Sequence, residues 1–178
     1  MNGSTLTLSP GTTVDGGDGY WIRVDVTLLA SQTDFFSSQV PLTGGSHGAG
    51  LWTGIYIAAK GHAVLDEVSI QNAKTALKVE GQLSAYKITI EDAYIGVNVF
   101  GSANIESLTA QHIDYEVLRN SGNLNLSTGT FTDIAGGLWS TGMSTVDTVT
   151  ISQAGTGLRS TSGTLSATGI GFIDTTCC

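Results

Sequence analysis

Residues 65–72, with the sequence LDEVSIQN, decide the fold, because their pattern returns along the chain at almost constant spacing. The later copies are 85–92 (AYKITIED), 105–112 (IESLTAQH), 126–133 (LSTGTFTD), 146–153 (VDTVTISQ) and 167–174 (ATGIGFID). Successive copies are separated by 20, 20, 21, 20 and 21 residues. A fixed period of this length is typical of a solenoid, in which each repeat stacks on its neighbours.

Four columns of mainly apolar residues run through these repeats in phase. They are Ile70, Ile90, Ala110, Phe131, Ile151, Phe172; Val68, Ile88, Leu108, Gly129, Val149, Ile170; Leu65, Ala85, Ile105, Leu126, Val146, Ala167; and Ala63, Leu83, Ala103, Leu124, Ser144, Leu165. Apolar residues alternate with hydroxyl residues, which is the pattern of a half-buried strand. We therefore expect Ile70, Ile90, Phe131 and Ile151 to line one interior ladder, with Thr89, Thr109, Thr130 and Thr150 outside.

The corners between strands have signals of their own. A second apolar element, such as 55–57, 77–79 or 97–99, is followed by glycine at 81, 101, 122, 142 and 163. We expect these glycines to form a corner, since glycine tolerates positive φ. A polar column follows the first strand: Asn72, Asp92, His112, Asp133, Gln153, Asp174. Short polar side chains there can bond the local backbone, which predicts a ladder of turns.

These signals predict an all-β fold, a right-handed parallel β-helix solenoid of about six coils of 20–21 residues. Strands stacked about 4.8 Å apart would bury the apolar columns between neighbouring coils. Residues 53–178 should form the coils. Residues 1–52 do not repeat the columns, and we expect them to be a divergent N-terminal cap of strands with a loop at 37–50, all within one domain.

Composition excludes several partners. The net charge is −8 with only seven Lys and Arg residues, so no basic stripe could follow a phosphate backbone. No apolar run has the length of a membrane span. The two cysteines, Cys177 and Cys178, are interpreted as a frayed end, with a vicinal disulfide or an intermolecular link as the alternative. They supply too few ligands for a metal site, and no metal or cofactor is predicted.

The opening of the chain resembles a known group of domains. Residues 6–14 (LTLSPGTTV), 26–30 (VTLLA), 52–57 (WTGIYI) and 65–73 (LDEVSIQNA) follow one another in order. This order is similar to that of right-handed β-helix domains of the pectate-lyase-like superfold in secreted and cell-surface proteins of bacteria and archaea. The resemblance implies an extracellular or cell-surface setting, often as one module of a longer chain.

A polysaccharide lyase or glycoside hydrolase is the enzymatic alternative. Stacked coils could bring Asp92, His112 and Asp133 near one another, but no nucleophile completes a catalytic set. The acidic pairs at 66–67 and 91–92 are near Lys87, yet successive strand residues point to opposite faces, so we expect neither pair to aim both carboxylates one way. The residues favour a non-enzyme over an enzyme and predict no catalytic residues.

Two sets of residues are candidates for binding. Tyr56, Tyr94, Tyr115 and Trp139 could stack on sugar rings. Thr128, Thr130, Thr148 and Thr150 form a flat hydroxyl array like those of ice-binding proteins, although threonine is also an ordinary solvent-facing strand residue. The favoured function is a non-catalytic extracellular or cell-surface module, structural or adhesive, with glycans or neighbouring surface modules as candidate partners. Ice binding through the threonine face is a second alternative.

Overall fold

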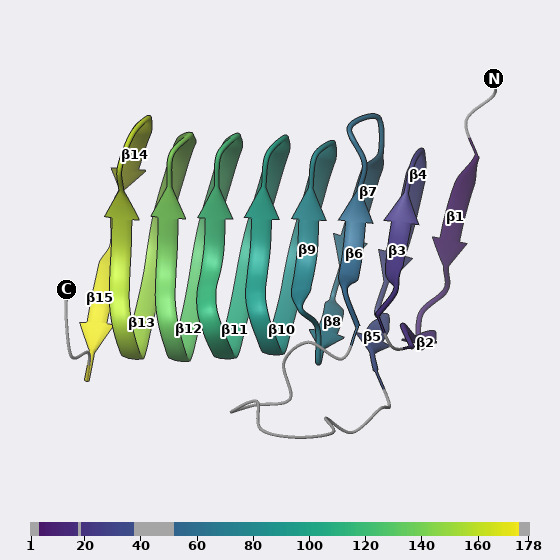
Figure 1. Cartoon of the computed structure of the whole chain (residues 1–178), viewed down its shortest axis with the longest axis horizontal. Helices are drawn as coiled ribbons and strands as arrows, with labels where there is room; N and C mark the ends of the chain where they lie inside the picture. Colours follow the sequence, from purple (N-terminus) through teal and green to yellow (C-terminus); the bar gives the residue numbers. More distant parts are fainter. Residues whose placement is uncertain (1–3, 18, 38–51, 175–178) are drawn as a thin grey trace.

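The computed structural model describes residues 4–17, 19–37 and 52–174, and within them the chain is a parallel β-solenoid of about seven turns without any helix. Figure 1 shows the chain rising along the front, crossing to the back and descending as it advances, which is the right-handed sense. The predicted fold class is therefore confirmed, with a coil number close to the expected one. The described residues form no helix, and so none that is long and apolar enough to cross a membrane.

The strands fall into short and long classes. The short strands are β1 (Thr5–Leu8), β2 (Thr13–Asp15), β3 (Trp21–Val24), β4 (Thr27–Ser31), β5 (Asp34–Phe36), β6 (Gly54–Ile57), β7 (His62–Asp66), β8 (Val68–Gln71), β9 (Thr75–Val79), β14 (Thr164–Ala167) and β15 (Ile170–Ile173). The long strands are β10 (Gln82–Val99), β11 (Ser102–Asn120), β12 (Asn123–Ser140) and β13 (Met143–Ser160). Each long strand of 18 or 19 residues pairs around almost a whole coil, because its corners bend the chain without ending the ladder.

The register confirms the predicted columns. Ile90 pairs with Ile70 on one side and Ala110 on the other, and Phe131 pairs with Ile151. Ile70, Ile90, Phe131 and Ile151 are all 0 % exposed. The threonines between them, Thr89, Thr109, Thr130 and Thr150, are exposed or half-buried. The core is thus a set of ladders of apolar side chains parallel to the solenoid axis.

The polar column lies at corners of the coil, where a ladder of turns was predicted, and the structure shows that these corners are left-handed. Its six residues have φ between 49° and 59°: Asn72, Asp92, His112, Asp133, Gln153, Asp174. A single left-handed residue turns the strand sharply and lets pairing continue on the next face. Non-glycine residues tolerate this conformation best when they are short and polar, which explains the composition of the column.

The corner glycines follow a different rule from the one predicted. Among the glycines at 81, 101, 122, 142 and 163, only Gly163 has positive φ. A Cβ at Gly101 would lie 2.2 Å from the carbonyl oxygen of Gly81 on the preceding coil, and the other four meet equally close carbonyls. Glycine is required at this corner because neighbouring backbones approach too closely for any side chain.

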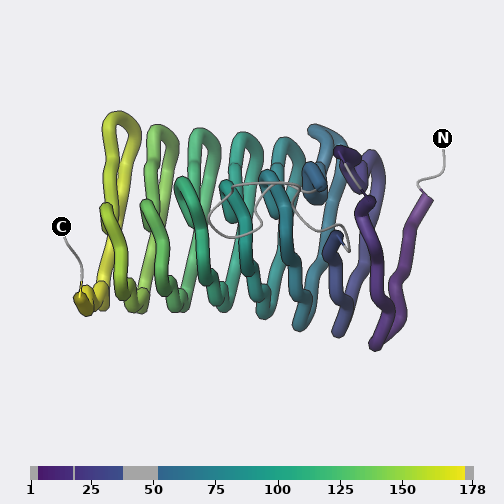
Figure 2. Tube along the Cα trace, turned by 60° about the horizontal axis from the view of Figure 1, so that its bottom comes forward, coloured from purple at the N-terminus to yellow at the C-terminus, as the bar shows by residue number. Residues whose placement is uncertain are grey.

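The N-terminal third joins the same ladders. β1 pairs with β4, β4 pairs with β7, and Leu6, Leu28 and Ala63 share one register position. β2, β3 and β5 pair in parallel in the same way, and Figure 2 shows these coils in line with the later ones. The residues between β5 and β6 lengthen one turn, so the columns shift out of phase and the sequence period disappears. The expected loop at 37–50 lies almost entirely outside the described residues.

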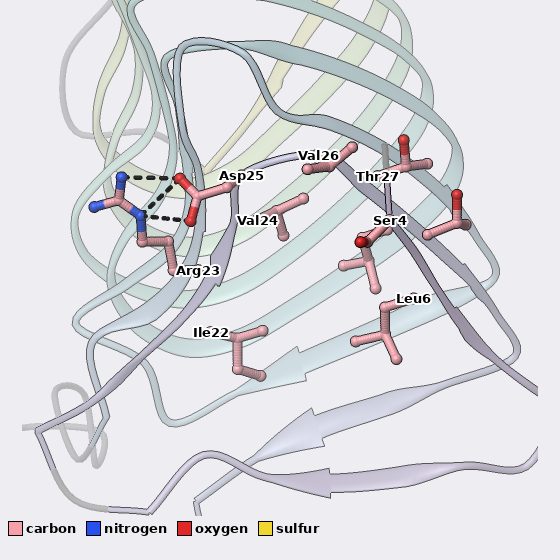
Figure 3. A pocket seen from close by; sticks show the side chains of 10 residues that line it. Ser4, Leu6, Ile22, Arg23, Val24, Asp25, Val26 and Thr27 are labelled. Atoms are coloured by element: carbon pink, nitrogen blue, oxygen red, sulfur yellow. Dashed lines mark hydrogen bonds and ion pairs between the residues drawn. The ribbon is translucent and has the colours of Figure 1, made fainter. Parts of the chain in front are cut away.

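Both ends of the described stack expose core positions. In the last described coil Phe172 is 40 % exposed, since none of the described residues covers it from the far side. In the first coil a cavity of about 300 Å³ opens beside Leu6, Ile22 and Leu28 (Figure 3). Arg23 and Asp25 form an ion pair of 2.9 Å at its rim. The ladders therefore bury a residue fully only where coils lie on both sides.

Candidate functional site

Trp139 lies in the outward column expected for it. Arg119, Trp139 and Arg159 occupy successive rungs on β11, β12 and β13. The guanidinium carbon of Arg119 lies 4.4 Å from the centroid of the Trp139 ring, and the indole N–H donates to the Thr161 hydroxyl at 3.3 Å. These contacts hold the ring in a fixed orientation while leaving it half-buried rather than enclosed.

A recess of about 230 Å³ lies beside this ring. Its lining includes Tyr115, Glu116 and Trp139 together with Arg159. The floor consists of residues with little or no side chain from two coils: Ala135, Gly136, Gly137, Gly157. The recess exists because Tyr115 and Glu116 of β11 are followed, on the next coil, by the small residues 135–137 of β12.

An aromatic ladder ends at the recess. The rings of Tyr94 and Tyr115, on adjacent coils, stack with centroids 5.3 Å apart and planes at 5°. On the next coil, Gly136 pairs with Glu116. Ala135, one residue before Gly136, therefore lies beside Tyr115 in the direction in which the stack would continue. A flat group placed there would continue the stack, and offset stacking is the arrangement that aromatic faces favour.

Glu116 supplies the polar group of the recess. Its side-chain oxygen Oε2 is buried and has no hydrogen-bond partner among the described residues. Burial raises the pKa of this carboxyl, and the nearby Arg119 and Arg159 partly offset that increase. A buried acceptor without a donor is unfavourable, so a ligand hydroxyl or ammonium group that donated to Oε2 would relieve a cost already present.

The comparisons with known proteins add no relative. No protein-family model, curated protein or solved structure matches the chain.

Tyr56 is engaged in internal contacts. Its hydroxyl donates to Glu80 at 2.6 Å, and the Nζ of Lys78 lies 4.6 Å from its ring centroid. The hydrogen bond to Glu80 raises the pKa of Tyr56, while Lys78, at 2.7 Å from Glu80, lowers the pKa of that carboxyl. Trp21 packs on the same ring at 5.7 Å. These contacts leave Tyr56 less suited to a ligand than Tyr115 or Trp139.

The threonine array is present in the predicted register. Thr128 pairs with Thr148, and Thr130 pairs with Thr150 on the neighbouring coil. Thr128, Thr130 and Thr148 are exposed and Thr150 is half-buried. The Thr128 hydroxyl already donates to the Glu106 carbonyl at 2.9 Å, so one member of the array is turned toward the backbone.

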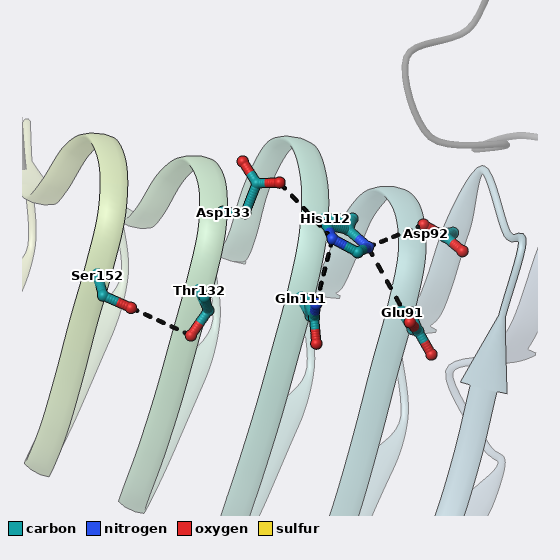
Figure 4. A network of polar contacts seen from close by, with 7 residues as sticks. All are labelled: Glu91, Asp92, Gln111, His112, Thr132, Asp133 and Ser152. Atoms are coloured by element: carbon teal, nitrogen blue, oxygen red, sulfur yellow. Dashed lines mark hydrogen bonds and ion pairs between the residues drawn. The ribbon is translucent and has the colours of Figure 1, made fainter.

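The corner ladder brings together Asp92, His112 and Asp133, as their spacing suggested. His112 Nδ1 lies 3.2 Å from Asp92 Oδ1 and 4.0 Å from Glu91 Oε1, and His112 Nε2 lies 3.6 Å from Asp133 Oδ2 (Figure 4). The expectation that Glu91 and Asp92 point to opposite faces is wrong. The left-handed φ of Asp92, 54°, breaks the strand alternation and turns both carboxylates toward His112.

The residues considered for polysaccharide cleavage have structural partners. Lys87 Nζ lies 3.9 Å from Glu67 Oε1, and the Ser31 hydroxyl donates to Asp66.

A shallow groove of about 490 Å³ passes Tyr86, Lys87 and Glu106. Tyr86, which is 55 % exposed, and Glu116 were not among the residues selected from sequence. Cys177 and Cys178 lie outside the described residues.

Proposed function

We propose that this chain is a non-catalytic β-solenoid module of a secreted or cell-surface protein, and that it binds neutral or amino sugars in the recess beside Trp139. The secreted setting follows the resemblance to β-helix domains of the pectate-lyase-like superfold. The observation that carries the binding proposal is the buried, unpartnered Oε2 of Glu116 in a recess lined by Tyr115 and Trp139.

The chemistry of the recess suits a sugar ring. A pyranose has an apolar C–H face that can stack on Tyr115, and hydroxyls that both donate and accept. The Glu116 carboxylate can only accept hydrogen bonds, whereas the Arg159 guanidinium can only donate them. Together they can therefore pair with both the O–H donor and the oxygen acceptor of sugar hydroxyls. Charge favours neutral or basic sugars, because a net charge of −8 repels polyanionic glycans.

The size of the recess limits the ligand. At about 230 Å³ it is smaller than the roughly 300–1,000 Å³ of sites for drug-sized ligands. It therefore accommodates about one ring, and we expect weak binding by a single copy of the module. Adhesion would then depend on several copies acting together, since linked weak sites gain avidity without new contacts.

The test is a glycan array followed by calorimetric titration of any hit. Trp139→Ala and Glu116→Gln should each weaken binding by about tenfold, equivalent to about 1.4 kcal/mol. Tyr86→Ala is the control, because it removes an exposed aromatic residue away from the recess. Unchanged affinity in both recess variants would refute the proposal, and release of reducing or unsaturated sugar ends would show an enzyme instead.

Ice binding remains a second candidate because the four threonines lie in register on two adjacent coils. Rungs about 4.8 Å apart give such an array a regular repeat. Thr130→Lys would place a long charged side chain in its centre. Thermal hysteresis in the parent that disappears in Thr130→Lys would support this function, and no hysteresis in the parent would exclude it.

A further inference from the structure

Glu91, Asp92 and His112 place three ligand atoms around one point at the corner ladder. Glu91 and Asp92 come from β10, and His112 comes from the adjacent coil, β11. One atom from each residue lies within 4.8 Å of the other two. All three are half-buried, so the corner holds them in place while water and ions can reach them.

The distances fit a small cation with mixed nitrogen and oxygen ligands. Zn²⁺ binds imidazole nitrogen at about 2.0–2.1 Å and carboxylate oxygen at about 2.0–2.2 Å, which in a tetrahedron keeps ligand atoms about 3.4 Å apart. The separation of His112 Nδ1 from Asp92 Oδ1 is 3.2 Å and from Glu91 Oε1 is 4.0 Å. The Glu91 oxygen is thus farther from His112 than a tetrahedral site requires, and its side chain would have to move inward to bind the same ion.

The other side of the imidazole ring has the partner that a metal-bound histidine needs. Coordination through Nδ1 requires the ring proton to lie on Nε2. Asp133 Oδ2 lies 3.6 Å from Nε2, just beyond hydrogen-bond distance, and a small movement would let it accept a hydrogen bond from the Nε2–H. The Gln111 side-chain nitrogen lies 3.1 Å from Nε2 and is itself a donor, so the Gln111 amide would have to turn its oxygen toward a protonated Nε2. Carboxylate–histidine–metal arrangements of this kind orient the ring and make the nitrogen a better ligand.

Charge also favours a cation. Glu91, Asp92 and Asp133 bring three carboxylates to one histidine, and no described lysine or arginine forms an ion pair with any of them. We propose that Glu91, Asp92 and His112 bind a divalent transition-metal ion of the Zn²⁺ type, with water completing the coordination. Imidazole as a ligand selects such an ion over Ca²⁺ or Mg²⁺, which prefer oxygen alone.

The site would link two coils at a corner. Asp92 and His112 belong to adjacent rungs of the left-handed column, so a shared ion would join β10 to β11 through side chains as well as backbone pairing. A ligand that binds only the folded state stabilises it. None of these three residues lines the sugar recess, and the proposal does not rest on the proposed glycan binding.

The experiment is a calorimetric titration of the full chain with Zn²⁺ in a Cys177→Ser/Cys178→Ser background, so that no thiolate contributes. One equivalent should bind and raise the melting temperature. His112→Asn and Asp92→Asn should each weaken binding by at least about tenfold, in line with the loss of a ligand. Both substitutions fit the corner, because Asn72 occupies the same column with a φ of 59°.

The control measurements distinguish Zn²⁺ binding at this site from misfolding of the variants and from binding elsewhere on the chain. Melting in the presence of a chelator should be the same for the parent, His112→Asn and Asp92→Asn, which shows that the variants fold. His62→Asn, which removes a histidine from the start of β7, should bind Zn²⁺ like the parent. The proposal is overturned if the parent binds no Zn²⁺ at a concentration of about 100 µM, or if His112→Asn binds Zn²⁺ as tightly as the parent.

Discussion

Shortening Ile90 to alanine should destabilise the solenoid by about 3–4 kcal/mol. Ile90 is 0 % exposed and lies between Ile70 and Ala110 in one ladder. The change removes three buried carbon atoms, worth about 2.4 kcal/mol at about 0.8 kcal/mol each. The remainder is the cavity term, because paired backbones hold the coils apart and Ala110 is too short to fill the space.

The assay is urea unfolding followed by circular dichroism, with Thr109→Ala as the control. Thr109 is exposed on the neighbouring coil, so its truncation should cost less than about 1 kcal/mol. For a domain of this size, the Ile90→Ala loss corresponds to a melting temperature lower by roughly 6–16 °C. Equal losses for Ile90→Ala and Thr109→Ala, at unchanged urea dependence, would refute the assignment of inner and outer faces.

Three further predictions concern particular residues. Glu116→Gln should stabilise the chain at pH 7. Burial raises the pKa of Glu116 in the folded state, so the stability associated with its protonated form is lost as pH rises through that pKa. The advantage of the variant should therefore vanish in thermal melts below about pH 4, where the carboxyl is protonated in the folded and the unfolded chain. Asn120→Ala should cost about 2 kcal/mol in urea unfolding, because the buried Asn120 amide donates to the Met143 carbonyl and the Ser144 hydroxyl at 2.8 Å, whereas exposed Asn123→Ala should be nearly neutral. Gly101→Ala should lower the melting temperature by many degrees, since its Cβ would lie 2.2 Å from the Gly81 oxygen, while Gly171→Ala, with no atom closer than 4.0 Å, should have little effect; similar melting of the two glycine variants would contradict the close approach of the coils.

The sugar recess shows where prediction from sequence ends. Trp139 can be recognised from sequence, because it is an aromatic residue in an outward column. Glu116 cannot, since a glutamate in a strand usually faces water, and it lies where the register between β11 and β12 shifts after Ile113. A pattern of small residues at 135–137 and 155–157 was the available signal for the recess.

The sequence by itself determined the apolar ladders and the column of turns beside them. Coils that stack in register place the same residue type at the same position, so columns such as Ile70, Ile90 and Ala110 are readable as a period. Only the tertiary structure decided how residues of different coils meet. The close approach at Gly101, the burial of the Glu116 Oε2 atom and the convergence of Glu91 with His112 depend on distances between neighbouring backbones, which no single strand encodes. The N-terminal coils were hidden for a related reason, since pairing in space tolerates an insertion that a sequence period does not.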